Sequence, residues 1–252
     1  MSTKLLFVKR IKTEKYSIFY SLIKYNNEII GFGRKHWDPK EKKIKIVKFN
    51  KELDIQQDNV EFLEGEDPRC FEFNDKIYVL NNYLSKMTLI DYKTKKEIKI
   101  NISGKNISFI NHNNKLYFIH YIKPFALYSF DIETGEIIKQ DVNDDKNTYN
   151  YEYRGGTPGY KLDDNTYYGF GHRTYSGKMG LTHDIFKWIV YFDKELPRIS
   201  FFDIDQPENS QRICDPTCVI EIDNKKYMVT AETHNQWFSD QDYITNLYEI
   251  VE

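Results

Sequence analysis

Short apolar segments alternate with polar turns along the whole chain, and one unit of this pattern occurs five times. Each unit is an apolar stretch, a turn of Asn or Asp residues, and a second stretch rich in Tyr, Phe, Ile and Val. Two such stretches around a polar turn predict a β-hairpin. The turns are at Asn26-Asn27, Asn74-Asp75, Asn113-Asn114, Asp163-Asp164 and Asp223-Asn224. They follow one another at 48, 39, 50 and 60 residues, a recurrence typical of propellers and solenoids.

A third apolar segment and a further polar turn follow each hairpin, so each unit has the length of one propeller blade. We therefore predict an all-β fold, a five-bladed β-propeller that forms a single domain over residues 1–252. The blades are expected near residues 14–60, 61–102, 103–148, 149–210 and 211–252. The N-terminal segment KLLFVKRIK has no hairpin of its own and is expected to close the last blade. Two packed sheets are the alternative, because hairpins alone do not determine how a sheet closes.

Composition agrees with this class and limits the partners. Aromatic residues make up 16% of the 252 residues, which suits strands more than helices. A formal net charge of −2 argues against nucleic acid or an acidic membrane surface as a partner. The apolar start is too short for a signal peptide, and no stretch reaches the length of a membrane span. Three cysteines without metal-ligand spacing fit a reduced, cytoplasmic chain.

The repeats predict where polar residues converge. In a propeller the first strand of a blade lines the central channel and the second runs back, so residues before the first and after the second open on one face. The candidates before first strands are Asp67, Arg69, Lys105, Asn106, Arg154, Thr157 and Asp215. The candidates after second strands are Arg34, His172, Arg173, Glu232 and His234. By contrast, His112 and His183 lie outside both sets and are expected at the surface or in packing.

Several of these residues also have a purely structural interpretation. An Asp-Pro pair, as at Asp67 and Asp215, is typical of a turn, because Asp bonds to its own backbone and Pro fixes φ. Arg69 could be a buried partner of the acids beside it, and His172 could be a hydrogen-bonded core histidine. The sequence leaves these alternatives open.

Three segments carry a resemblance to a known family. They are EDPR at residues 66–69 with the aromatic hairpin after it, KNISFINHNNKLYF in the third unit, and RGGTPGYKLDDNTYYGFGHR in the fourth. In this order they resemble the five-bladed propellers of glycoside hydrolase family 130, the β-mannoside phosphorylases and hydrolases, and related mannosyltransferases. The entries to the first and fifth units depart from the family pattern, since they read Phe19-Tyr20-Ser21 and Cys214-Asp215-Pro216. The donor sugar and the acceptor therefore stay open.

The resemblance implies a division of roles. Asp67 would be the general acid that protonates the glycosidic oxygen, and Arg69, Arg154 and His172 would hold an anion such as phosphate. These roles are chemically coherent, because a leaving group needs a proton and a phosphate needs cations.

The reaction is then a choice among three. A hydrolase needs a second carboxylate as base, for which Glu232 or Asp215 could serve. A phosphorylase needs cations and no base, and a nucleotide-sugar transferase also needs cations. The abundance of Arg and His favours inverting glycosyl transfer on a β-mannoside-like glycan, as a glycoside phosphorylase or glycosyltransferase. A small sugar or glycan would be the partner, with inorganic phosphate or a sugar nucleotide as co-substrate and with no cofactor or metal.

Two alternatives remain at this stage. One is a β-glycoside hydrolase of the same fold. The other is a non-catalytic propeller that binds a glycan or a protein, because propellers have many functions.

Overall fold

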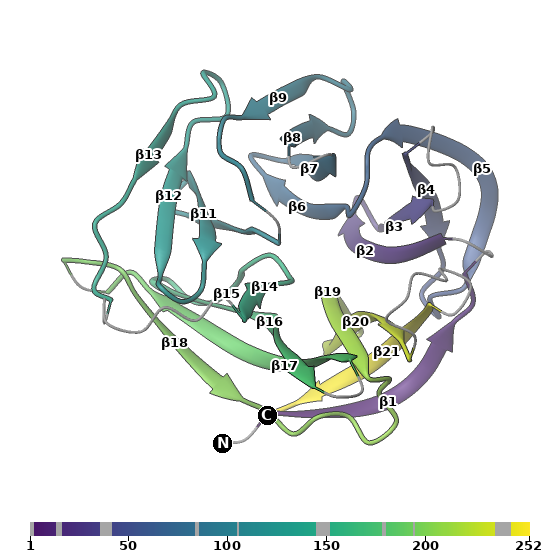
Figure 1. Cartoon of the computed structure of the whole chain (residues 1–252). Helices are drawn as coiled ribbons and strands as arrows, with labels where there is room; N and C mark the ends of the chain where they lie inside the picture. Colours follow the sequence, from purple (N-terminus) through teal and green to yellow (C-terminus); the bar gives the residue numbers. More distant parts are fainter. Residues whose placement is uncertain are drawn as a thin grey trace.

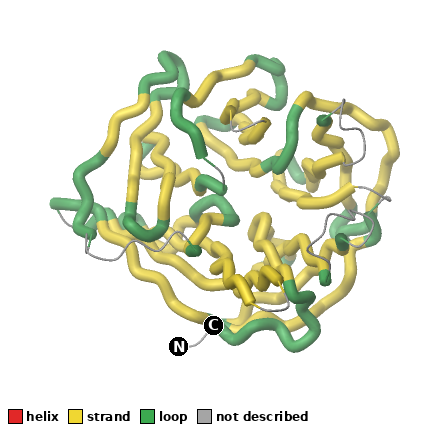
Figure 2. Tube along the Cα trace, viewed as in Figure 1, coloured by secondary structure: helices red, strands yellow, loops and turns green. Residues whose placement is uncertain are grey.

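The computed structural model describes residues 3–13, 17–35, 42–83, 86–104, 106–144, 152–177, 180–193, 195–234 and 243–252, and all of its regular elements are strands. Lys105 lies outside these residues. Figures 1 and 2 show the strands grouped in sheets around a common centre. No helix long and apolar enough to cross a membrane occurs in the described part of the chain.

Three antiparallel sheets of four strands form the first three blades. The first has β2 (Ser17–Tyr25), β3 (Glu28–Lys35), β4 (Lys43–Phe49) and β5 (Ile55–Glu64). The second has β6 (Arg69–Phe73), β7 (Lys76–Tyr83), β8 (Lys86–Asp91) and β9 (Glu97–Ile100). The third has β10 (Ser108–His112), β11 (Lys115–Tyr121), β12 (Ala126–Phe130) and β13 (Ile137–Lys139). The first blade thus ends at Glu64, past the expected boundary at residue 60, because β5 keeps pairing with β4 up to that residue.

The last two blades share hydrogen bonds and so form one nine-stranded sheet. The fourth has β14 (Tyr153–Gly155), β15 (Tyr160–Asp163), β16 (Thr166–Gly177), β17 (Gly180–Tyr191) and β18 (Arg198–Asp203). The fifth has β19 (Ile213–Ile222), β20 (Lys225–Thr233), β21 (Ile244–Val251) and, as its outer strand, β1 (Lys4–Ile11). A parallel bridge between His183 and Ile213 joins the two. β1 pairs antiparallel with β21 (Figure 1), so residues from the two ends of the chain share one blade.

The core is divided into five apolar clusters, and each lies between two neighbouring blades. Successive residues of one strand enter different clusters: Tyr78 and Leu80 face the third blade, whereas Val79 faces the first. Both faces of each blade are therefore buried, which explains why the inner strands read as nearly continuous apolar runs. Because every blade packs against two neighbours, the five blades form a closed ring, the five-bladed β-propeller that the repeats predict.

The predicted turns are confirmed as the ends of hairpins. In the first, second, third and fifth hairpins both turn residues have positive φ, between 49° and 63°. This is the type I′ geometry, which Asn and Asp tolerate better than other side chains. The fourth turn differs, because the Asp163 side chain accepts a hydrogen bond from the Asn165 backbone N–H at 2.9 Å.

The innermost strands are sheet edges, and their free backbone groups are bonded by side chains of the neighbouring blade. The backbone N–H of Cys70 donates to Ser21 Oγ at 3.0 Å, and that of Leu22 donates to Cys218 Sγ at 3.1 Å. Thr217 Oγ1 lies 2.5 Å from the carbonyl oxygen of Tyr20. A buried backbone group without a partner costs free energy, so these bonds hold the blades in register around the channel.

We expect Thr217→Val to lower the free energy of unfolding by about 1–3 kcal/mol, because it leaves buried carbonyl oxygens unpaired while keeping the side-chain volume. Thr217 is fully buried and also lies 3.0 Å from the carbonyl oxygen of Val229. Denaturant unfolding measures the change. The control is Thr182→Val at a half-buried position of β17. Equal stability of the two variants would contradict the proposed role of this bond.

Candidate active site

Two clusters of polar side chains lie where the inner strands begin, at the end of the channel opposite the hairpin turns. The first is built on the segment before β6, and the second on β16, β17 and β19. Arg69, the first residue of β6, lies between them.

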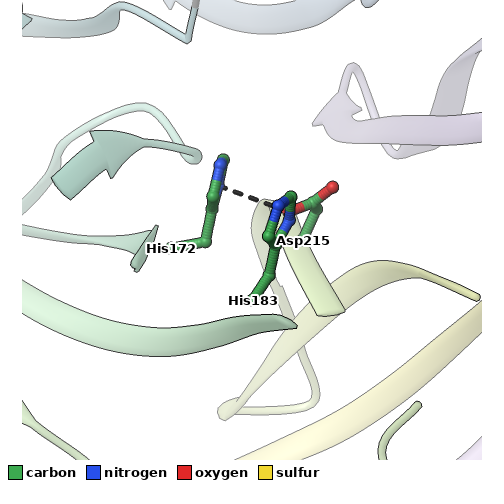
Figure 3. Close-up of side chains that lie close together, drawn as sticks. All are labelled: His172, His183 and Asp215. Carbon is green, nitrogen blue, oxygen red and sulfur yellow. Dashed lines mark hydrogen bonds and ion pairs between the residues drawn. The ribbon is translucent and has the colours of Figure 1, made fainter. Parts of the chain in front are cut away.

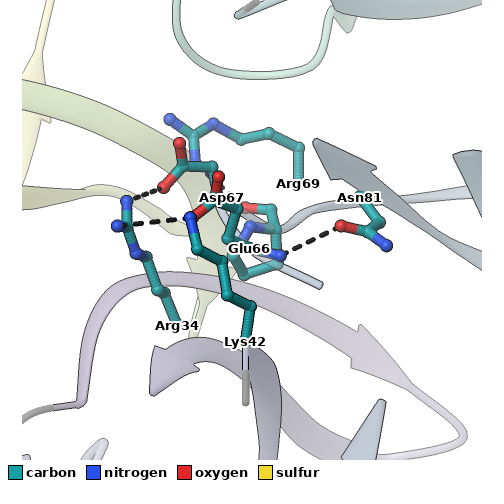
Figure 4. Close-up of polar contacts among 7 residues, drawn as sticks. Arg34, Lys42, Glu66, Asp67, Arg69 and Asn81 are labelled. Carbon is teal, nitrogen blue, oxygen red and sulfur yellow. Dashed lines mark hydrogen bonds and ion pairs between the residues drawn. The ribbon is translucent and has the colours of Figure 1, made fainter. Parts of the chain in front are cut away.

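The first cluster pairs two acids with two cations. Arg34 Nη1 lies 2.7 Å from Asp67 Oδ1, and Arg34 Nη2 lies 3.4 Å from Glu66 Oε2. Lys42 Nζ lies 2.6 Å from the same Glu66 oxygen. Figure 4 shows the Arg34 and Lys42 side chains rising from the first blade toward both carboxylates. The four charges balance one another, and the Asp67 side chain keeps 23% of its surface exposed.

The backbone around Asp67 is held by Asn81 in β7. Asn81 Oδ1 accepts a hydrogen bond from the Glu66 backbone N–H at 3.0 Å, and Asn81 Nδ2 donates to the Glu64 carbonyl oxygen at 2.8 Å. Gly65 has a φ of +133°, and a Cβ there would lie 1.9 Å from Asn81 Oδ1, so only glycine fits. Asp67 itself has a φ of +51°. The carboxylate is thus fixed by a turn that the neighbouring strand supports.

Arg69 is buried, and it connects distant parts of the ring. Its Nε donates to the Gly156 carbonyl oxygen at 2.7 Å, in the fourth blade, and its Nη1 donates to the Pro68 carbonyl oxygen at 2.9 Å. Burial lowers the pKa of Arg69, while the negative charges of Asp67 and Asp215 oppose this shift. One guanidinium therefore balances carboxylates from the second and fifth blades.

The second cluster joins His172, His183 and Asp215 (Figure 3). Asp215 Oδ1 lies 2.7 Å from His183 Nδ1 and 3.4 Å from His172 Nδ1, and the two imidazole rings stack at 4.6 Å. Burial lowers the pKa of His172 to about 4, although the charge of Asp215 opposes this. Burial alone would raise the pKa of Asp215, but His172, the hydrogen bond with His183 and the charge of Arg69 hold it below its usual value.

Sequence reasoning missed two residues of this region. His183 was expected at the surface or in packing, but β17 pairs with β16 along its whole length, which brings His183 opposite Thr174 and beside the site. Tyr243 precedes the last strand, and its ring lies 5.1 Å from that of Phe19. Burial raises the pKa of Tyr243, with contributions from the charges of Asp215 and Asp67. The long antiparallel pairing signal of β16 and β17 could have identified His183, whereas no pattern identified Tyr243.

Two predicted site residues belong to the framework instead. Thr157 is fully buried, and its hydroxyl lies 3.0 Å from the Phe170 backbone N–H and 2.8 Å from the Pro158 carbonyl oxygen. Glu232 is also fully buried. Its carboxylate accepts hydrogen bonds from the Gln211 backbone N–H at 2.8 Å, from Thr230 at 2.5 Å and from Tyr248 at 2.7 Å. With its oxygens bonded to the framework, Glu232 is not placed to act as a base.

The remaining candidates lie around the two clusters. Arg154 is exposed and pairs with His172 across β14 and β16. Arg173 donates to the Tyr153 hydroxyl at 2.9 Å, on the flank of the fourth blade. Asn106 is half-buried and has a φ of +57°, and His234 is exposed and directly follows β20. Lys105, predicted as a ligand of phosphate, falls outside the described residues.

A cavity of about 880 Å³ lies at the other end of the channel, near the hairpin turns. Phe71, Phe109 and Tyr160 are among its lining residues, with Asp223 at the turn. Asp67 and His172 are absent from its lining, so this cavity is separate from both polar clusters.

Comparisons with known proteins identify the fold. No family model matches the chain, and no curated protein matches its sequence. The structure is similar to a thermostable family-43 glycoside hydrolase, with 12% identity, a TM-score of 0.65, and 98% of this chain and 93% of that chain covered. It is also similar to MPT-4, a mannose phosphorylase from Leishmania mexicana in complex with phosphate, with 9% identity, a TM-score of 0.63, and coverage of 98% and 88%. A GH43_1 enzyme from Xanthomonas citri complexed with xylose shows 8% identity, a TM-score of 0.62, and coverage of 96% and 89%. At these identities the likeness shows a shared five-bladed propeller.

We expect Arg69→Met to lower the free energy of unfolding by about 3 kcal/mol or more, because it leaves two carbonyl oxygens unpaired and two carboxylates without their shared cation. Arg69→Lys keeps the charge and should lose less. Denaturant unfolding measures both variants against Arg10→Met, which alters an exposed arginine of β1. The role assigned to Arg69 is wrong if Arg69→Met is as stable as Arg10→Met.

Proposed function

We propose that this protein is a carbohydrate-active enzyme that transfers a glycosyl group with inversion, between a β-mannoside-like glycan and phosphate or a phosphorylated sugar donor. The observation that carries the proposal is the pairing of Asp67 with Arg34, next to the buried Arg69, at one end of a five-bladed propeller channel. A carboxyl group and several cations are the groups that protonation of a leaving sugar and binding of a phosphate require.

In the phosphorolytic direction, a phosphate oxygen attacks the anomeric carbon while the bond to the glycosidic oxygen breaks. Asp67 gives its proton to that oxygen as the bond breaks. The products are a sugar 1-phosphate of inverted configuration and a glycan shorter by one unit. The reaction needs no second carboxylate, because the phosphate is already a nucleophile.

Arg34 connects phosphate binding to the state of Asp67. In the free protein Arg34 Nη2 lies 3.4 Å from Glu66 Oε2 and Arg34 Nη1 lies 2.7 Å from Asp67 Oδ1. The positive charge of Arg34 is therefore balanced by these two carboxylates. A phosphate that binds Arg34 would take the place of the Asp67 carboxylate in this contact, while the charge of Arg69 stays near Asp67. The phosphate would therefore release the Asp67 carboxyl group from Arg34, so that it can contact the glycosidic oxygen.

Inverting hydrolysis is the second candidate, and Asp215 favours it. Asp215 Oδ1 lies 2.7 Å from His183 Nδ1, which orients the carboxylate. The charge of Arg69 acts on both Asp215 and Asp67. This arrangement suits a base that activates water. A third possibility is a binding module without turnover, in which the same polar groups hold a glycan.

Replacing Asp67 with Asn should lower kcat by about 10²–10⁴-fold while sugar affinity stays within a few fold, because the amide keeps the shape and cannot donate the proton. The assay uses aryl β-mannosides and β-mannobiose with inorganic phosphate, without phosphate, and with nucleotide sugars. The matched control is Asp164→Asn, whose exposed side chain lies at the fourth hairpin turn.

The products separate the reactions. Phosphate-dependent release of an inverted sugar 1-phosphate supports phosphorolysis, and phosphate-independent release of an inverted free sugar supports hydrolysis. A retained configuration rules out single displacement. Sugar binding without turnover on any donor supports the binding module.

Arg34→Gln should raise the KM for phosphate by at least about tenfold and change the KM for the sugar less, because one charge-assisted contact contributes about 1.5–3 kcal/mol. Steady-state kinetics with each substrate varied in turn measures the two constants, and Arg10→Gln is the control. An equal rise in both constants would contradict a specific role of Arg34 toward phosphate.

A further inference from the structure

His172, His183 and Asp215 bring three metal-ligating groups together on neighbouring strands. His172 is in β16, His183 is in β17 and Asp215 is in β19. Antiparallel pairing fixes β16 against β17, and the bridge from His183 to Ile213 fixes β17 against β19. The strand pairing therefore fixes the relative positions of the three Cα atoms, independently of any contact between the side chains.

The distances fit a small coordination site. In a tetrahedral zinc site the ligand atoms lie about 2.0–2.2 Å from the ion and so about 3.4 Å from one another. Asp215 Oδ1 lies 3.4 Å from His172 Nδ1 and 2.7 Å from His183 Nδ1, and all three ligand atoms lie within 4.8 Å of one another. The rings now stack at an angle of 16°, so binding requires a rotation about χ2 that turns both nitrogen lone pairs toward one point.

An unpartnered nitrogen is the second observation that points to a ligand. His172 Nδ1 is buried and makes no hydrogen bond, since its contact with Asp215 Oδ1 is 3.4 Å long, and the side chain is 5% exposed. Buried polar atoms are seldom left without a partner, because desolvation without compensation is costly. A metal ion between His172 and Asp215 would supply the missing partner.

We propose that these three side chains bind a divalent transition-metal ion of the zinc class. Two imidazoles and one carboxylate suit such ions, whereas calcium and magnesium prefer oxygen ligands. Three protein ligands leave a fourth position for water or a ligand oxygen. The positive charges of Arg69 and Arg154 act on His172 and weaken the site, while the Asp215 carboxylate favours it.

The proposal departs from the sequence-based expectation of no metal, which rested on ligand spacing along the sequence and which remains a prediction. The three ligands are up to 43 residues apart, and only the strand pairing brings them together. The proposal does not depend on the glycosyl reaction, because it concerns binding of an ion by the free protein.

The test starts from natively purified protein that has been treated with a chelator to remove metals. This protein is titrated with zinc chloride, and its affinity is measured by competition with a chromogenic chelator. Elemental analysis after desalting then gives the number of zinc ions per chain. We expect about one zinc ion per chain and a zinc-dependent rise in Tm. His172→Ala, His183→Gln and Asp215→Asn should each weaken zinc binding by at least about tenfold. His234→Ala, which alters an exposed histidine, is the matched control and should keep wild-type affinity.

Three results would overturn the proposal. They are absence of stoichiometric zinc on the folded wild-type protein, wild-type zinc affinity in the His172 and His183 variants, and calcium binding in place of zinc in a parallel titration with calcium chloride. Circular dichroism of each variant establishes that it is folded, and the wild-type titration decides the question even if a variant does not fold. Enzyme assays are not part of the readout, so failure of the glycosyl-transfer proposal leaves this result unaffected.

Discussion

The burial of Arg69 is the constraint on which the polar end of the channel depends. Arg69 is 5% exposed as a residue, and its guanidinium must be bonded and balanced, because an unpaired buried charge is strongly destabilising. Its Nε bonds to the Gly156 carbonyl oxygen across the ring, and its charge is balanced by Asp67 and Asp215. One side chain therefore connects the second, fourth and fifth blades and keeps two carboxylates near each other.

Closure of the ring gives the site its rigidity. Each blade buries both faces against its neighbours, and the inner edges are bonded by groups such as Ser21, Thr217 and Cys218. A polar residue at the start of an inner strand is thus held by contacts on two sides. The polar clusters draw on residues from separate blades, and such a site keeps its geometry only if the blades cannot slide.

The sequence predicted the architecture well because turn chemistry is local. In four of the five hairpins the turn is a pair of Asn or Asp residues at positive φ, and this sequence signal marked the right positions. Polar residues were harder to assign, because the same residue types serve two purposes. Thr157 and Glu232 form hydrogen bonds with buried groups of the framework, whereas a site residue of the same type would bind a ligand. Burial and hydrogen-bond partners, which the linear pattern does not contain, distinguish the two uses. His183 was missed for another reason, because its place depends on how far β17 continues along β16.

The two clusters differ in how their charges are balanced, and they therefore differ in the kind of ligand that suits them. Around Asp67 the acids are already paired with Arg34 and Lys42, so an incoming anion can exchange with a carboxylate for the same cations. Around Asp215 the neighbours are imidazoles, which bind a cation or a proton but hold an anion weakly when neutral. This difference supports the proposals of phosphate at the Arg34 side and of a metal ion at the His183 side. Since Arg69 is shared by both acids, a ligand bound at either cluster changes the charge balance at the other.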